Sequence, residues 1–140
     1  MIQHDEIADL LGIKLGATPL KVLTAIEKGL SVNALERVSR SLAPSDANFK
    51  FAIVSRATLA RRKHARNRLS SEESDKLARI AKIWTFAVAV WGDEGSARSF
   101  LFRPHQLLEG RRPIDVTLKT EMGSTLVENI LGRLQHGTAV

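Results

Sequence analysis

Cysteine and tyrosine are absent from the 140 residues, which contain only two tryptophans and five phenylalanines. Without cysteine the chain has no disulfide framework, no thiolate zinc site and no cysteine nucleophile. The scarcity of aromatic rings leaves little surface on which single-stranded bases could stack. Because the sequence shows no uncharged apolar run of membrane-spanning length and no signal-peptide pattern, we expect a cytoplasmic protein without a membrane span.

Catalytic, metal-binding and cofactor-binding patterns are also missing. The four histidines are scattered, and none has a second histidine at the helical spacing typical of a metal-ligand pair. The only compact glycine pair, GDEG at residues 92–95, lacks the lysine and the preceding strand of a phosphate-binding loop. No serine, histidine and aspartate set has a recognisable local context. We therefore expect no enzyme activity, no metal site and no cofactor.

Positive charge, by contrast, is abundant and unevenly distributed. Residues 1–70 contain 12 Lys/Arg and 6 Asp/Glu, whereas residues 71–140 contain nine of each, so the net charge of +6 lies in the first half. Six basic residues fall between Arg56 and Arg68, and no acidic residue occurs from Asn48 to Ser71. Such asymmetry predicts that the first half meets a polyanion. The alternative is a solvated basic face that only maintains solubility.

Apolar spacing and helix-boundary signals predict an all-α fold with almost no strand. In the helix expected from Pro19, Leu20 and Leu23 should point inward, as should Leu126 in the last helix. A short helix capped by Ser45 and running through Phe49, Ala52 and Ile53, followed by a basic helix at residues 56–65, forms a helix-turn-helix pattern. Further helices are expected at residues 7–11, 19–28, 31–42, 70–91, 96–102 and 124–134, with another opened by Pro113.

The helix expected at residues 70–91 has a broad apolar side and joins two predicted domains. Residues 1–69 form the first, a DNA-binding helix-turn-helix module, and residues 70–140 form the second, a small helical domain. An apolar side this broad is typical of a helix that is deeply buried or part of a dimer core. The candidate core or dimer residues on it are Trp84, Val88 and Trp91.

The basic helix offers a way to bind DNA. If Leu59 faces the core, helical geometry turns Ala57, Arg61 and His64 outward, and small side chains there allow a close approach to a groove. Arginine can bond guanine O6 and N7 together, and hydroxyl groups at the helix start can donate to phosphate oxygens. The predicted DNA-binding residues are Ser55, Arg56, Ala57, Thr58, Arg61, Arg62 and Lys63, with Arg56 and Arg61 reading bases. Alternatively, some arginines pair with acids at the start of the next helix.

Three stretches together resemble a known protein family over nearly the whole chain. They are GLSVNALERVSRSL at residues 29–42, SRATLARRKHARNRLSSEESDKLARIAKI at residues 55–83, and the segment from WGDEG to RLQHG at residues 91–137. Their order is similar to that of the Xre/MbcA/ParS family of antitoxins. Relative to the usual family pattern, Trp91 and Phe100 exchange one aromatic for another, and Met122 is inserted before Gly123.

The resemblance implies an Xre-like helix-turn-helix module followed by a toxin-binding and dimerisation domain. It implies a type II antitoxin that forms a homodimer, represses its own operon by binding operator DNA, and neutralises a cognate RES-domain toxin that depletes NAD. The NAD chemistry would then belong to the toxin. The end of the chain would approach the toxin's active-site cleft, so the predicted toxin-binding residues are Arg133, Gln135, His136 and Val140. The alternatives are a free-standing helix-turn-helix regulator without a toxin, and a pure toxin inhibitor whose basic helix is only a solvated face.

Overall fold

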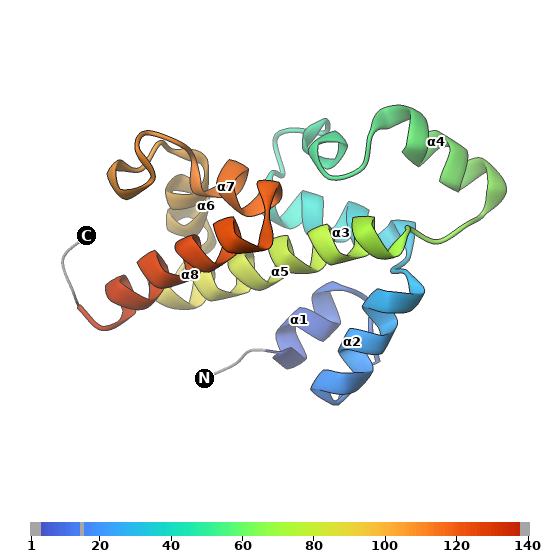
Figure 1. The fold of residues 1–140 in the computed structure, drawn as a ribbon, viewed down its shortest axis with the longest axis horizontal. Helices are drawn as coiled ribbons and strands as arrows, with labels where there is room; N and C mark the ends of the chain where they lie inside the picture. The colour runs from blue at the N-terminus through green and yellow to red at the C-terminus, as the bar shows by residue number, and fades with distance from the viewer. Residues whose placement is uncertain (1–3, 15, 138–140) are drawn as a thin grey trace. The chain divides into compact units, whose positions relative to one another are not determined.

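A computed structural model describes residues 4–14 and 16–137 and confirms the all-α prediction. Within these ranges the only β-structure is an isolated bridge between His105 and Arg111. None of the helices described is long and apolar enough to cross a membrane. The elements are α1 (His4–Leu10), α2 (Pro19–Lys28), α3 (Val32–Leu42), η1 (Phe49–Ala52), α4 (Arg56–Ala65), α5 (Ser71–Trp91), α6 (Glu94–Phe102), η2 (Gln106–Leu108), α7 (Pro113–Lys119) and α8 (Glu121–Gln135) (Figure 1).

The chain forms two compact units, Met1–Ala81 and Lys82–Val140, and the division between them falls within the residues of α5. The predicted domain boundary, between residues 69 and 70, falls just before α5 begins. The predicted boundary precedes the long helix, whereas the structural division lies within that helix, where residues stop contacting the first unit and begin to contact the second. The functional boundary therefore stays a prediction.

In the first unit, α3 is the central helix and contacts α1, η1 and α4. Ser31 caps it by accepting a hydrogen bond from the Ala34 N–H at 3.1 Å. Its inward side chains Leu35, Val38 and Leu42 are at most 1% exposed. This apolar side gives α4 a surface to pack against through Leu59, which is also buried.

A junction of hydrogen bonds ties the loop between α2 and α3 to the start of α5. The Leu30 N–H donates to the buried Ser74 Oγ at 2.8 Å, and the Leu69 N–H donates back to the Leu30 carbonyl at 2.9 Å. Gly29 lies at φ +104°, and a Cβ on it would collide with the Leu69 carbonyl oxygen. Only glycine allows this approach of the two backbones.

In the second unit, α7 packs against both α6 and α8. Gly123 lies where α8 comes closest to α7, and a Cβ there would collide with the carbonyl oxygen of Val116. Among the candidate core residues of α5, Trp84 is buried, Val88 is half-buried, and Trp91 is 40% exposed. Trp91 is thus available at the surface of the unit.

Several local predictions are wrong. The segment before α4 forms only the short turn η1, because the Asp46 side chain accepts the Asn48 N–H at 2.9 Å and competes with helical hydrogen bonding. α6 begins at Glu94 rather than at Ser96, since Asp93 is its N-cap. α8 begins at Glu121, because Thr120 caps it and Gly123 serves close packing instead of ending a helix. Met122, the inserted residue, is 76% exposed in its first turn.

The inward side of two helices was also wrongly assigned. Leu20 and Leu23 of α2 are 69% and 50% exposed, and Leu126 of α8 is 49% exposed. Apolar residues occur on more than one side of α2, where Val22 and Ile26 are only half-buried. Spacing alone therefore did not select the buried side.

The contact at Gly123 leads to a stability prediction. Gly123→Ala should lower the free energy of unfolding by about 1–3 kcal/mol, because the added methyl group forces α8 away from α7. Gly132→Ala is the matched control, since it lies in the same helix with open space around it. It should be neutral or stabilise by up to about 1 kcal/mol. Urea denaturation of both variants tests this, and equal stability of the two would contradict the packing argument.

Candidate functional site

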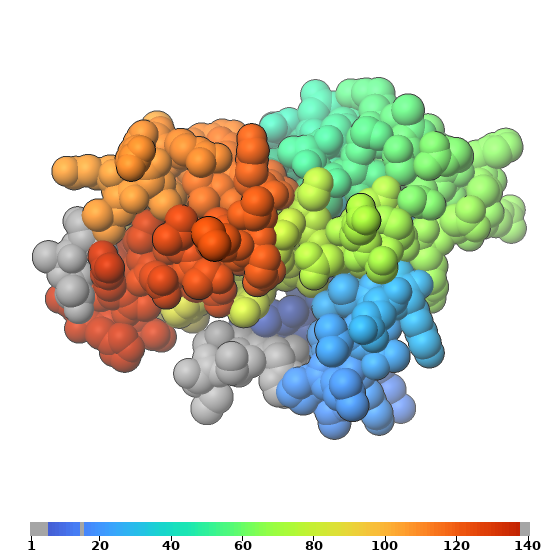
Figure 2. All heavy atoms as spheres, in the orientation of Figure 1, coloured from blue at the N-terminus to red at the C-terminus, as the bar shows by residue number. Residues whose placement is uncertain are grey.

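Helix α4 presents the predicted DNA-reading side to solvent. Leu59 is 2% exposed and packs inward, while Ala57, Arg61 and His64 are exposed, as the helical spacing predicted. In the space-filling view the α4 segment, coloured green, stands at the surface of its unit (Figure 2). The helix therefore has the orientation that a recognition helix requires.

The first turn of α4 is held by its own hydroxyl groups. Ser55 is the N-cap, and its Oγ accepts the Thr58 N–H at 3.3 Å and donates to Thr58 Oγ1 at 2.9 Å. The Thr58 hydroxyl hydrogen can then donate to a phosphate oxygen together with the free backbone N–H groups of the turn. Both residues lie where the prediction requires.

Arg56 is held in place by two residues that sequence reasoning missed. Its guanidinium carbon lies 4.0 Å from the centroid of the Phe51 ring, and its Nη2 donates to Asn48 Oδ1 at 3.3 Å. A guanidinium stacked on an aromatic face loses less conformational freedom when it binds. An aromatic residue five positions before an arginine gave no signal, because η1 was expected to be a regular helix.

Arg62 forms a bidentate ion pair with Glu73. The Arg62 Nε and Nη2 atoms donate to the two carboxylate oxygens at 3.1 and 3.3 Å, and both side chains are about four-fifths buried. Glu73 also accepts the Ser70 N–H at 2.7 Å, while its own N–H donates to Ser70 Oγ at 3.1 Å, which completes a capping box. Burial raises the pKa of Glu73, but the hydrogen bonds from Ser70 and Arg62 outweigh it and hold the pKa below its ordinary value.

Glu36 of α3 binds two lysines. Its Oε1 accepts from Lys50 Nζ at 3.0 Å and from Lys63 Nζ at 3.3 Å. Burial raises the pKa of Glu36, yet the two ammonium groups lower it further than burial raises it. The Lys63 side chain is 50% exposed, so it can reach a phosphate by leaving a weak surface pair.

The three arginines among the predicted DNA-binding residues therefore differ in how they are held. Arg61 is exposed and has no ion-pair partner among the described residues, whereas Arg56 is stacked and Arg62 is fixed by Glu73. The pairing of Arg62 matches the alternative that some arginines bind acids at the start of the next helix. Two further arginines of the basic segment lie outside the predicted set: Arg68 donates to the Gly29 carbonyl at 3.3 Å, and Arg66 ends α4 in the left-handed region at φ 56°. Arg61 is the cation of α4 with the fewest internal ties.

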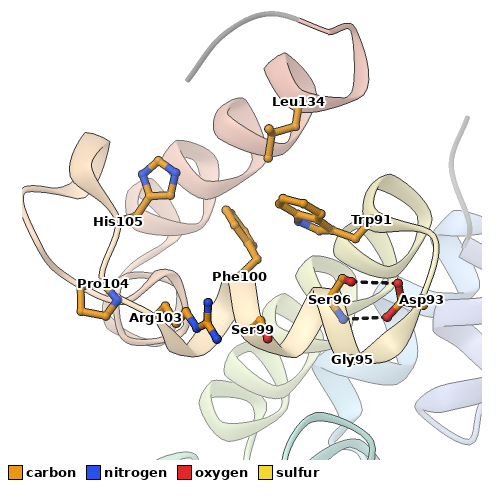
Figure 3. Close-up of a pocket in the computed structure, with 10 residues that line it drawn as sticks. All are labelled: Trp91, Asp93, Gly95, Ser96, Ser99, Phe100, Arg103, Pro104, His105 and Leu134. Carbon is orange, nitrogen blue, oxygen red and sulfur yellow. Dashed lines mark hydrogen bonds between the residues drawn. The ribbon is translucent and has the colours of Figure 1, made fainter.

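The second unit contains a concave site that sequence reasoning did not find. A cavity of about 720 Å³ lies between the end of α5, α6, the following loop and α8. Its apolar lining is Trp91, Phe100, Pro104 and Leu134, and Figure 3 shows the Phe100 ring between the rings of Trp91 and His105. The centroids are 5.9 Å apart for Trp91 and Phe100, and 5.8 Å apart for Phe100 and His105. Residues distant in sequence build this cavity, so spacing gave no signal for it.

The predicted toxin-binding residues lie at the far end of α8. Arg133 and Gln135 are exposed in its last turn, and His136 is the exposed C-cap whose N–H donates to the Gly132 carbonyl at 3.1 Å. Val140 lies outside the described residues. The structure thus places three of the four on one helix end, next to Leu134 of the cavity.

Comparisons with known proteins agree with this arrangement of a helix-turn-helix unit and a second helical unit. Residues 21–82 match the antitoxin Xre-like helix-turn-helix domain, and residues 86–137 match the antitoxin Xre/MbcA/ParS C-terminal toxin-binding domain. The chain is therefore a two-domain protein of the antitoxin class. Its curated relatives share one name, and the chain belongs to the Xre antitoxin family.

Three relatives carry the name Antitoxin Xre. The protein of Yersinia enterocolitica is 32% identical over 119 residues, which are 83% of this chain and 79% of the relative. That of Pseudomonas putida is 31% identical over 130 residues, covering 91% of this chain and 79% of the relative. That of Photorhabdus laumondii is 26% identical over 114 residues, covering 80% and 76%.

The ion pair behind the recognition helix leads to a pH-dependent prediction. Glu73→Gln should lower the free energy of unfolding by about 1–3 kcal/mol at pH 7, because it leaves Arg62 without its carboxylate. Since the pKa of Glu73 is lower in the folded protein, its stabilisation is fully present above its ordinary value of 4.5 and is lost as pH falls below it. The difference between wild type and variant should therefore shrink in acid.

Urea denaturation at several pH values measures this difference. Glu72→Gln is the matched control, because Glu72 is an exposed neighbour in the same turn and should cost less than about 1 kcal/mol. A stability difference for Glu73→Gln that is independent of pH would contradict the assigned role of the carboxylate.

Proposed function

We propose that this antitoxin neutralises a RES-type toxin that depletes NAD and represses its own operon by binding operator DNA. The observation that carries the proposal is the match of one chain to both an Xre-like helix-turn-helix domain and a toxin-binding domain. The RES type of the partner rests on the family resemblance. In this proposal the protein acts in the cytoplasm, where its operon is transcribed.

The charges of the first unit support the DNA half of the proposal. All of the excess positive charge lies in residues 1–70, and exposed Arg61 and stacked Arg56 stand on the outer side of α4. Phosphate contacts supply affinity that depends on salt, while base-edge contacts supply sequence preference. We propose that Arg56 and Arg61 read bases and that Ser55, Thr58 and Lys63 contact phosphates. Arg62 supports α4 from behind and contacts a phosphate only if its pair with Glu73 opens.

Operators read by helix-turn-helix proteins usually contain paired half-sites, so we propose that the protein binds as a homodimer. Of the candidate dimer residues, the buried Trp84 is not available for such contacts, and the exposed part of Trp91 lines the cavity described above. Trp84 is a packing residue, with the Arg98 guanidinium carbon 5.3 Å from the centroid of its ring.

The second unit supports the toxin half of the proposal. The end of α8 carries exposed polar side chains at Arg133, Gln135 and His136, and four further residues follow His136 in the printed sequence. A polar segment of this kind suits a cleft that binds a charged dinucleotide. Blocking such a cleft would stop NAD consumption without any chemistry by the antitoxin.

Two alternatives make different predictions. A free-standing regulator would have no toxin gene beside its own, and its second unit would only dimerise. A pure toxin inhibitor would bind its promoter no more tightly than unrelated DNA. Specific promoter binding that weakens steeply with salt, together with a neighbouring toxin gene, separates the proposal from both.

The DNA contacts are tested by two substitutions. Arg61→Ala should weaken operator binding by about 1–3 kcal/mol and relax sequence preference, because a base-reading contact is lost. Lys63→Ala should weaken operator and unrelated DNA alike and reduce the salt slope by about one. Lys119→Ala, an exposed lysine of the second unit, is the control. Fluorescence anisotropy across salt concentrations measures all three, and identical behaviour of the first two would overturn the assigned roles.

The toxin contacts are tested by removing residues 136–140, which leaves all of α8 and Leu134 in place. Cells that express the toxin with this truncated antitoxin should stop growing, whereas full-length antitoxin should restore growth. Operator affinity should be unchanged, because the first unit is intact. Full protection by the truncated protein would show that the terminal segment has no part in neutralisation.

A further inference from the structure

We propose that the cavity of the second unit is an anchor site for the toxin, which inserts an apolar side chain followed closely by a carboxylate. This inference rests on the proposed toxin partner and adds a second point of attachment to the end of the chain. All lining residues belong to the unit Lys82–Val140 and to the segment that matches the toxin-binding domain. The site is therefore continuous with the surface already assigned to the toxin.

The size and lining of the cavity suit a protein side chain. Its volume of about 720 Å³ accommodates a large apolar group together with neighbouring atoms. Trp91, which is 40% exposed, lines the cavity beside Phe100, and Leu134 points toward these two rings from α8 (Figure 3). Aromatic walls around a desolvated pocket are typical of the few contacts that dominate binding energy at protein interfaces.

The polar groups of the cavity favour a negatively charged neighbour. Arg103 is exposed and has no ion-pair partner among the described residues. His105 Nδ1 accepts the Leu107 N–H at 3.0 Å, which leaves Nε2 as the donor of the ring. The single carboxylate of the lining, Asp93, is occupied by Ser96, whose N–H and hydroxyl donate to it at 2.7 and 2.8 Å. The Arg103 guanidinium and His105 Nε2 are thus available to donate to a carboxylate of the toxin, while the Asp93 carboxylate already accepts two hydrogen bonds from Ser96.

The anchor is separate from the predicted terminal contact but close to it. Leu134 lines the cavity from α8, one residue after Arg133 and one before Gln135. A toxin that fills the cavity would hold this helix end against its own surface. Binding of the segment after α8 to the cleft would then be intramolecular and occur at a high effective concentration. The affinity of the antitoxin for the toxin would therefore exceed that of either contact alone.

Filling the cavity tests the proposal without removing any packing. Ser99 lines the cavity and is exposed, so Ser99→Phe places a ring in the space that the toxin side chain would occupy. Ser99→Ala is the matched control because it leaves the space open. Arg103→Glu reverses the charge at the rim, with Arg103→Lys retaining it and Lys119→Glu making the same change away from the cavity.

Each full-length variant would be titrated with the toxin encoded by the adjacent gene, using biolayer interferometry, with operator affinity and melting temperature as controls for folding. Ser99→Phe and Arg103→Glu should each weaken toxin binding at least about tenfold, while the three controls stay within about threefold of wild type. A folded Ser99→Phe that binds the toxin like wild type overturns the anchor, whatever Arg103→Glu does. Failure of wild type to bind the toxin at all overturns the proposed function itself, and the anchor with it.

Discussion

The hydrogen bond from the Leu30 N–H to the buried Ser74 hydroxyl fixes the start of α5, and the helix-turn-helix unit depends on it. The Leu69 N–H closes the same junction by donating to the Leu30 carbonyl. One residue before Ser74, Glu73 completes the capping box of α5 and clamps Arg62 of α4. A single helix start therefore sets where α4 lies.

This constraint gives different tasks to basic residues that look equivalent in the sequence. Arg62 holds α4 through its pair with Glu73, whereas Lys63 and Lys50 share the single carboxylate of Glu36. Arg61 is left to solvent, and Arg56 is aligned by Phe51. The basic helix thus combines a supported inner side with an outer side suited to a DNA groove. Surface pairs stabilise weakly, so Lys63 can exchange its carboxylate for a phosphate at little cost.

Local signals in the sequence predicted the helices better than the contacts between them. The helices expected at residues 19–28, 31–42 and 56–65 form within one residue of those bounds, with Thr18, Ser31 and Ser55 as their N-caps, and the exposed face of α4 followed from Leu59 alone. The pairs of Glu36 with Lys50 and Lys63 join residues 14 and 27 positions apart, which no helical spacing encodes. The last helix was expected to begin only after Gly123, because the role of Gly123 depends on the backbone of α7. The cavity requires residues from several elements at once.

The second unit adds a surface of a different kind, in which aromatic rings, two unengaged donors and an exposed helix end lie on the toxin-binding domain. We propose that this surface protects cellular NAD from the partner toxin. The most direct measurement is the NAD concentration in cells that express the adjacent gene product with and without this chain. NAD should fall when the toxin is expressed alone and stay at the uninduced level when both are present. A toxin that arrests growth without lowering NAD, or NAD loss that this chain does not prevent, would contradict the account.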